Sequence, residues 1–173
     1  MKSLCLALLL LVALAPATHA ATDLSFDTGP GEVACNDEIW IDVVVDAGAV
    51  DLRGLSIEVS IDPTLVEYVD FAAGTLFDDA PCDPFLYGID QGGGEALIDV
   101  AGLGCSVNGA GSVARILLRG LANGVSPLQG LAATLRTSTN ASIAATWTDG
   151  SLLVSCPIEN DAPSLGTLKG RYR

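Results

Sequence analysis

The stretch that decides the fold runs from Leu52 to Phe77 and reads LRGLSIEVSIDPTLVEYVDFAAGTLF. In its first ten residues, apolar side chains alternate with small or polar ones. The apolar set is Leu55, Ile57, Val59 and Ile61, and the other set is Gly54, Ser56, Glu58 and Ser60. A period of two places the two sets on opposite faces, which is typical of a half-buried antiparallel strand. Asp62-Pro63-Thr64 ends this strand, because proline has no backbone N–H to donate. A second strand is expected near Val66 to Phe71.

Short stretches of the same kind recur along the chain. The candidate strands are 24–26, 38–46, 52–61, 66–71, 86–90, 96–101, 113–121, 131–137 and 151–156. Turn sequences rich in glycine separate them, among them Gly92-Gly93-Gly94 and Asn123-Gly124, and no convincing amphipathic helix occurs. About nine short strands at regular spacing predict an all-β fold, a two-sheet antiparallel jelly-roll sandwich.

The first twenty residues have the organisation of a signal peptide. Lys2 supplies a positive charge, residues 4–15 form an apolar run, and Thr18-His19-Ala20 offers small residues for cleavage after Ala20 or Ala21. The apolar run is too short to span a bilayer, and no later stretch qualifies. We expect a secreted or surface-exposed protein, with a β-sandwich domain at 21–156 and a basic tail at 157–173. Cleavage would also remove His19, the only histidine, and with it every mechanism that needs one.

Four cysteines remain after the leader, and an even number in an exported chain predicts two disulfides with three possible pairings. We favour Cys82–Cys105, because folding residues 85–102 into a hairpin brings these two cysteines level. Cys35–Cys156 would then connect the start of the sheet to its last strand. Neither pair has a metal-binding CxxC spacing.

The formal net charge of −13 argues against nucleic acid and anionic membranes as partners, since both attract basic surfaces. The tail is the exception, with Lys169, Arg171 and Arg173 close together. It is either a frayed terminus or a recognition segment for sorting or attachment.

No constellation of residues predicts catalysis, so we expect a protein that is not an enzyme. The candidates for a catalytic pair of carboxylates are Glu58, Glu67, Asp70 and Asp99. Acids that alternate with apolar residues, however, usually form a solvated face. Asp78, Asp79 and Asp83 crowd one loop and are weak candidates for calcium ligands, without the spacing of an EF-hand. No other cofactor is expected.

Aromatic side chains are candidates for carbohydrate binding, because sugar rings lie against aromatic faces. The rings best suited are Trp40, Tyr68, Tyr87 and Trp147. Trp40 occupies the outward phase of its strand, and Trp40 with Trp147 forms the candidate platform, with core packing as the alternative for each ring.

One string of residues resembles the cohesin domain, the receptor module of bacterial polysaccharide-degrading assemblies. It consists of Ile61-Asp62-Pro63, Leu65-Val66, Val69, Phe71 and Gly74, and the similarity extends from Leu24 to Cys156. Cohesins bind dockerin helices across a flat sheet face that includes the outward side of the strand at 52–62. The resemblance thus implies a binding face at Gly54, Ser56, Glu58 and Ser60, with Tyr87 near a partner-contacting position. Cohesins commonly carry Asn and Asp where this chain has Gly54 and Ser56.

The sequence therefore predicts a secreted, non-catalytic binding module. Its ligand is expected to be a protein partner, dockerin-like, or a polysaccharide in an extracellular assembly. The alternative is a structural surface or matrix subunit that self-assembles. The oligomeric state stays open.

Overall fold

The structure is a computed structural model that describes residues 21–81 and 83–157, and its central strand is β4 (Leu52–Ser60). The side chains of Leu55, Ile57 and Val59 are buried, whereas Ser56 is half-buried and Glu58 is exposed. This is the phase that the alternation predicted. β4 is hydrogen-bonded on both sides, which places these residues in the middle of a sheet.

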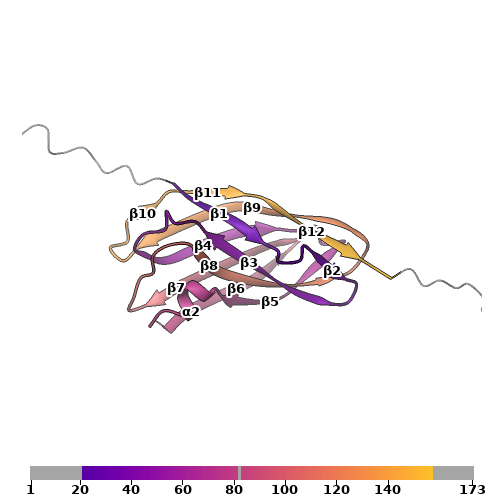
Figure 1. Ribbon diagram of the computed structural model, residues 1–173, viewed down its shortest axis with the longest axis horizontal. Helices are drawn as coiled ribbons and strands as arrows, with labels where there is room; N and C mark the ends of the chain where they lie inside the picture. Colours follow the sequence, from indigo (N-terminus) through magenta and orange to yellow (C-terminus); the bar gives the residue numbers. More distant parts are fainter. Residues whose placement is uncertain (1–20, 82, 158–173) are drawn as a thin grey trace, which may run out of the picture.

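Two β-sheets pack face to face as a sandwich (Figure 1). The five-stranded sheet has the order β11 (Ala145–Thr148), β1 (Thr22–Asp27), β3 (Glu38–Val45), β8 (Gly111–Gly120) and β5 (Val66–Ala73). The seven-stranded sheet has the order β2 (Glu32–Ala34), β12 (Gly150–Ser155), β9 (Gly124–Thr137), β4, β7 (Glu95–Leu103) and β6 (Asp83–Gly92), and β10 (Ser142–Ile143) pairs with β9. One short helix, α2 (Thr75–Asp78), follows β5 and buries Phe77.

All nine candidate strands are present, and the all-β sandwich is confirmed. Within the described residues there are three further strands, β2, β10 and β11, with three, two and four residues. Strands this short contain too few residues for a period of two to be recognised. Two pairings, β1 with β11 and β2 with β12, are parallel, although the predicted sheets were antiparallel. Both join segments far apart in the sequence, which the local pattern does not reveal.

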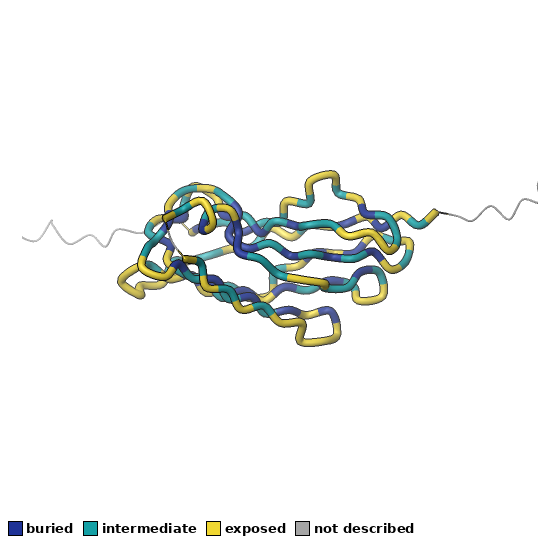
Figure 2. The backbone as a smooth tube through the Cα atoms, turned by 90° about the horizontal axis from the view of Figure 1, so that it is seen from below, coloured by how far each residue is buried: buried dark blue, intermediate teal, exposed yellow. Residues whose placement is uncertain are grey.

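The core fills the space between the two sheets, where buried positions alternate with exposed ones along the strands (Figure 2). Its largest fully buried aliphatic side chains are Leu24, Ile41, Leu52, Ile57, Ile98, Leu118, Leu128, Leu135 and Leu152. Removing such a side chain from water stabilises the folded state by about 1.5–3 kcal/mol. Both sheets contribute, so neither can bury its apolar face without the other.

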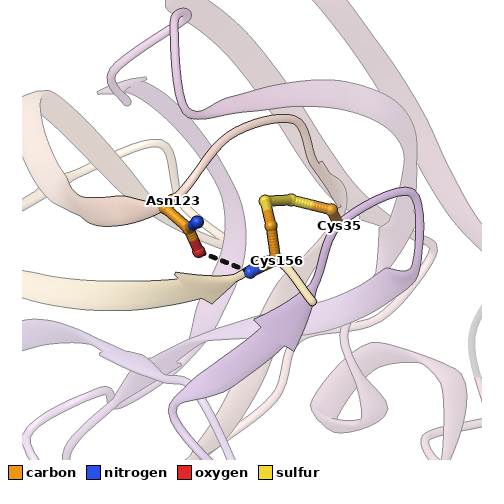
Figure 3. Close-up of a disulfide and its surroundings, with 3 residues drawn as sticks. All are labelled: Cys35, Asn123 and Cys156. Atoms are coloured by element: carbon orange, nitrogen blue, oxygen red, sulfur yellow. Dashed lines mark hydrogen bonds between the residues drawn. A yellow bond between two sulfur atoms is a disulfide. The ribbon is translucent and has the colours of Figure 1, made fainter. Parts of the chain in front are cut away.

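A disulfide joins Cys35, which directly follows β2, to Cys156, which directly follows β12 (Figure 3). The Cα atoms of the two cysteines are 4.8 Å apart, and the backbone N–H of Cys156 donates a hydrogen bond to Oδ1 of Asn123. This pair was predicted and is confirmed, which excludes a Cys35–Cys82 bond. Cys105 is also disulfide-bonded, but its predicted partner Cys82 lies outside the described residues, so that pairing stays a prediction.

The predicted leader (1–20) and nearly all of the predicted basic tail (157–173) lie outside the described residues. The described chain enters the sandwich at one end of its long axis and leaves at the other (Figure 1). None of the helices among the described residues is long and apolar enough to cross a membrane.

Replacing both cysteines of the observed bridge (Cys35→Ser with Cys156→Ser) should lower the free energy of unfolding by about 2–5 kcal/mol, because the bond closes a long loop in the unfolded chain. Its cysteines are 121 residues apart in the sequence. Chemical denaturation of the two proteins measures the difference. Asn123→Ala is the matched control; it removes only the hydrogen bond to Cys156 and should cost about 1 kcal/mol. Equal denaturation midpoints for the double variant and the unmodified chain would contradict the stabilising role.

Candidate functional site

The strands β9, β4, β7 and β6 expose one broad face to solvent, which we call the outer face. Its residues lie in three register rows across the four strands. The rows are Arg136–Gly54–Ala101–Phe85, Thr134–Ser56–Asp99–Tyr87 and Ala132–Glu58–Leu97–Ile89. The predicted binding residues Gly54, Ser56, Glu58 and Tyr87 therefore share one surface, and Ser60 continues it between Gln129 and Glu95.

The middle of the outer face is flat because β4 carries small side chains there. Gly54 and Ser56 are half-buried, and their register partner Ala101 on β7 is also small. A Cβ atom at Gly54 would lie 3.2 Å from the carbonyl oxygen of Val100, so the strands leave little room for a larger residue. A flat strip of this kind allows the backbone of another element to come close.

Beside the flat strip, β6 exposes a row of apolar side chains at the edge of the sheet. Phe85, Tyr87 and Ile89 have exposed fractions of 50%, 46% and 41%. These residues alternate along β6, and their register partners on β7 include Leu97 and Ala101. Neighbouring exposed apolar groups on a soluble protein indicate a surface for an interaction partner.

The orientation of this row follows from a contact between the two sheets. Gly88 lies on the inward phase of β6, directly against the ring of Phe71 from β5; a Cβ atom at Gly88 would come within 2.6 Å of that ring. Leu86, the other inward side chain, packs against the core. The inward space of β6 is thus filled by Phe71 and Leu86, and the bulky residues at 85, 87 and 89 face outward.

Tyr68, considered as a sugar-binding ring, lies inside the sandwich instead. Its hydroxyl donates to the carbonyl oxygen of Gly94 at 3.1 Å, and its ring is 5.7 Å from that of Phe71. Burial raises the pKa of Tyr68 far above its usual value, and the negative charges of Asp90 and Glu95 add to this effect. Tyr68 is therefore a structural residue that connects β5 with the turn after β6.

The structure does not bring the two tryptophans of the candidate carbohydrate platform together. Trp147 points inward, stacks on Phe26 with ring centroids 5.3 Å apart, and has a buried Nε1 atom. It packs so closely against β9 that a side chain at Gly130 would overlap the indole ring. Trp40, on β3 of the same five-stranded sheet, does point outward, but the guanidinium of Arg115 lies over its ring, 4.8 Å from the centroid. Trp147 therefore has the alternative role, packing in the interior, and the two rings do not form a common platform.

The four carboxylates considered for catalysis are divided between the two outer surfaces of the sandwich. Glu58 and Asp99 lie on neighbouring strands of the outer face, whereas Glu67 and Asp70 belong to β5 in the opposite sheet. Glu67 accepts a hydrogen bond from Arg119, which also binds Glu38 and whose pKa is raised by these two contacts. The four acids do not converge on one cleft.

Asp78, Asp79 and Asp83, the weak calcium candidates, are not assembled into a binding site. In the described part of the chain, no group of three or more His, Cys, Asp or Glu side chains is close enough together to hold a metal ion. Asp78 and Asp79 lie at the end of α2, and Asp83 begins β6.

Several residues of the outer face could not be recognised from the sequence. Phe85 and Ile89 share the phase of Tyr87, but both phases of β6 contain apolar residues, so periodicity could not show which one faces the core. Arg53 and Arg136, at the end of the face where β4 and β9 meet, were also missed. Their proximity depends on pairing between strands more than 80 residues apart, for which the sequence holds no local signal.

The similarity of this chain to known proteins lies in its fold. No protein-family model matches the sequence, and no curated protein matches it. Solved structures do match. A non-cellulosomal cohesin from the archaeon Archaeoglobus fulgidus has a TM-score of 0.63 and 13% identity, over 89% of this chain and 100% of its own. The seventh ScaB type I cohesin from Pseudobacteroides cellulosolvens has a TM-score of 0.65 and 14% identity, over 82% and 96%. The sixth cohesin of Acetivibrio cellulolyticus scaffoldin B, solved with a Cel5 dockerin mutant, has a TM-score of 0.63 and 17% identity, over 79% and 100%.

The chain therefore has a cohesin-like β-sandwich fold, as the resemblance in its sequence implied. At these identities the similarity concerns the fold; the ligand has to be argued from the surface itself.

The two tryptophans should respond differently to truncation. Trp147→Ala should lower the free energy of unfolding by about 3 kcal/mol, because it empties space between the sheets. Trp40→Ala should cost about 1 kcal/mol or less, since it removes a half-buried surface ring and its contact with Arg115. Thermal and chemical denaturation measure both losses. Equal losses of stability in the two variants would contradict this assignment. Strong binding of the unmodified chain to insoluble glycans would also contradict it, if Trp147→Ala abolished that binding without unfolding the protein.

Proposed function

We propose that the chain is a non-catalytic binding module that receives a protein partner on the outer face. The observation that carries this proposal is the flat strip of β4 beside the exposed row Phe85, Tyr87 and Ile89. Interface centres are commonly built from aromatic and aliphatic anchors surrounded by polar residues. On the outer face Asp99, Glu58 and Thr134 supply that polar surrounding.

The solved neighbours support a particular class of partner. The Acetivibrio cellulolyticus cohesin was solved with a dockerin, as were two cohesins of Clostridium thermocellum, from OlpC and OlpA. We therefore propose a dockerin-like partner, one that presents helices to a flat sheet. Because Gly54 and Ser56 occupy positions where cohesins commonly carry Asn and Asp, the partner's contacts at this point are expected to differ.

A protein ligand agrees better with the outer face than a polysaccharide does. Sugar binding favours aromatic rings that lie together on one surface. Trp40 lies on the opposite sheet and Trp147 inside the sandwich, which leaves Phe85 and Tyr87 on the outer face, separated by one residue along an edge strand.

The proposed setting is extracellular. The Cys35–Cys156 bridge is of the kind that persists in oxidising compartments, and a leader at residues 1–20 would direct the chain there. Participation in a polysaccharide-degrading assembly is part of the same proposal.

Ser56→Arg should abolish capture of the partner, because a long cation would stand up from the middle of the flat strip. The measurement is co-precipitation of the full chain from the culture supernatant of its own organism. Ser25→Arg is the matched control: Ser25 is equally half-buried but lies on β1 in the opposite sheet. Tyr87→Ala should weaken binding by about tenfold or more, as for a central aromatic anchor. Partner retention by Ser56→Arg together with Tyr87→Ala would refute the outer face as the binding surface.

A second candidate, a structural subunit that self-assembles, is favoured by the position of β6. This strand has ten residues and lies at the border of its sheet, and among the described strands it pairs with β7 alone. An exposed apolar edge of such length is a template for pairing with another copy.

If β6 mediates self-assembly, the sedimentation coefficient of the chain should rise with concentration, and Ile89→Lys should remove that rise. Val125→Lys is the control, since Val125 is an exposed apolar residue of β9, away from this edge. A sedimentation coefficient independent of concentration would contradict the structural candidate and leave partner binding as the function.

A further inference from the structure

The four cationic side chains in the described part of the chain are divided into two pairs with different surroundings. Arg115 and Arg119 lie on β8 and form ion pairs with Asp42, Glu38 and Glu67. Arg53 and Arg136 form no ion pair within residues 21–81 and 83–157. This is unexpected in a protein with 21 acidic and 8 basic residues, where almost any exposed arginine could find a carboxylate.

The two unpaired arginines line the same hollow at the end of the outer face. It has a volume of about 320 Å³, and the small residues Gly54 and Ala101 also line it. The turn at Ser138 and Asn140 closes one side. Arg53 belongs to β4 and Arg136 to β9, and both are exposed.

Most of the hydrogen-bonding capacity of these guanidinium groups is unused in the described structure. Arg53 Nη1 donates to the carbonyl oxygen of Ser138 and Arg136 Nη1 to that of Asn140, both at a long 3.4 Å. Each guanidinium has five N–H donors in a planar fork that matches a carboxylate. The two weak contacts hold the side chains over the hollow and leave the forks available.

Asp51, whose pKa is influenced by the charge of Arg53, already accepts other hydrogen bonds. Its Oδ2 accepts hydrogen bonds from Ser138, from Oγ at 2.7 Å and from the backbone N–H at 3.3 Å. Hydrogen bonds from the Ser106 and Ser138 side chains lower its pKa most, and the charge of Arg53 contributes least. Asp51 thus fixes the turn that borders the hollow and does not neutralise the arginines.

We propose that Arg53 and Arg136 form a carboxylate-binding site that takes an acidic side chain of the protein partner. This inference rests on the proposed function and specifies the chemistry of the partner. Arg136 and Phe85 are at opposite ends of one register row, three strand spacings or about 14 Å apart. The partner would therefore place an Asp or Glu at one end of its contact surface and apolar side chains at the other.

An acidic protein is favoured over an acidic polysaccharide because the register row of Arg136 also contains apolar residues. Ala101 and Phe85 continue it toward Tyr87 and Ile89, which offer apolar contact to aliphatic or aromatic groups. A uronic-acid chain carries a charge on each sugar, and it would meet Asp99, Glu58 and Glu95 farther along the face. A partner with one acidic cluster and an apolar surface avoids that repulsion.

The test uses the full ¹⁵N-labelled chain and follows the Nε–Hε signals of its arginines by NMR. Titration with glutarate at constant ionic strength should shift the Arg53 and Arg136 signals to saturation. Arg115 and Arg119, already ion-paired on the other sheet, should stay nearly unchanged and serve as references within the same spectrum. Neutral glutaramide should shift none of them.

Arg136→Gln should weaken glutarate binding by about fivefold, as expected for one exposed charge pair, and Arg119→Gln should not. Equal responses of all four arginines would overturn the proposal.

Two further probes decide the source of the carboxylate. Hexaglutamate should bind more tightly than hexagalacturonate; the reverse order would overturn the assignment to a protein partner. In co-precipitation, Arg53→Gln with Arg136→Gln should reduce partner capture, whereas Arg119→Gln should not. If Ser56→Arg abolishes capture and Tyr87→Ala weakens it, but the arginine variants do not, the proposed function holds and the carboxylate site is refuted. If glutarate saturates the site but the Ser56→Arg variant still captures the partner, the carboxylate site is supported and the docking of a protein on the outer face is refuted.

Discussion

The hydrogen bonds of β4 to β7 on one side and to β9 on the other are the constraint on which the sandwich depends. The buried side chains of β4 belong to the core between the two sheets, whereas Ser56 and Glu58 reach the outer face. Because the period of a strand is two residues, a slip of one residue in either pairing would expose Leu55, Ile57 and Val59 and bury Glu58. The free-energy cost of such a slip fixes the register, and the register fixes the order of residues on the outer face.

The two outer surfaces of the sandwich have different chemistry. On the five-stranded sheet, Arg119 bridges Glu38 and Glu67, and Arg115 contacts Asp42 and the ring of Trp40, so charges there compensate one another. On the seven-stranded sheet, the outer face combines a flat centre, an exposed apolar row and two arginines that form no ion pair with any described residue. A surface with unsatisfied groups has more to gain from association than one with its charges already paired. This difference is the physical reason for assigning binding to the outer face.

Much of the fold could be predicted because its strands are local patterns. The alternation at 52–61 indicated which side chains of β4 are buried, and the predicted Cys35–Cys156 bridge is present. The candidate binding residues Gly54, Ser56, Glu58 and Tyr87 lie on one surface, because the first three share a strand phase and Tyr87 lies in the row of Ser56. The predicted carbohydrate platform of Trp40 and Trp147 is not formed, because it depended on contacts between segments far apart in the sequence. Trp40 and Trp147 are on different strands, and no local pattern shows that Trp147 turns inward against Phe26 and Gly130.

The sequence by itself determined the nine longer strands and the phase of the central strand β4, since a period of two can be recognised in consecutive residues. It also determined the class of fold, because many short alternating strands can bury their apolar faces only by packing two sheets together. Only the tertiary structure decided the composition of the proposed binding surface. Phe71 occupies the space below Gly88 and so turns Phe85, Tyr87 and Ile89 outward. The pairing of β4 with β9 brings Arg53 and Arg136 to one hollow. Both depend on contacts between residues far apart in the chain, whose free energy exists only once the sheets have formed.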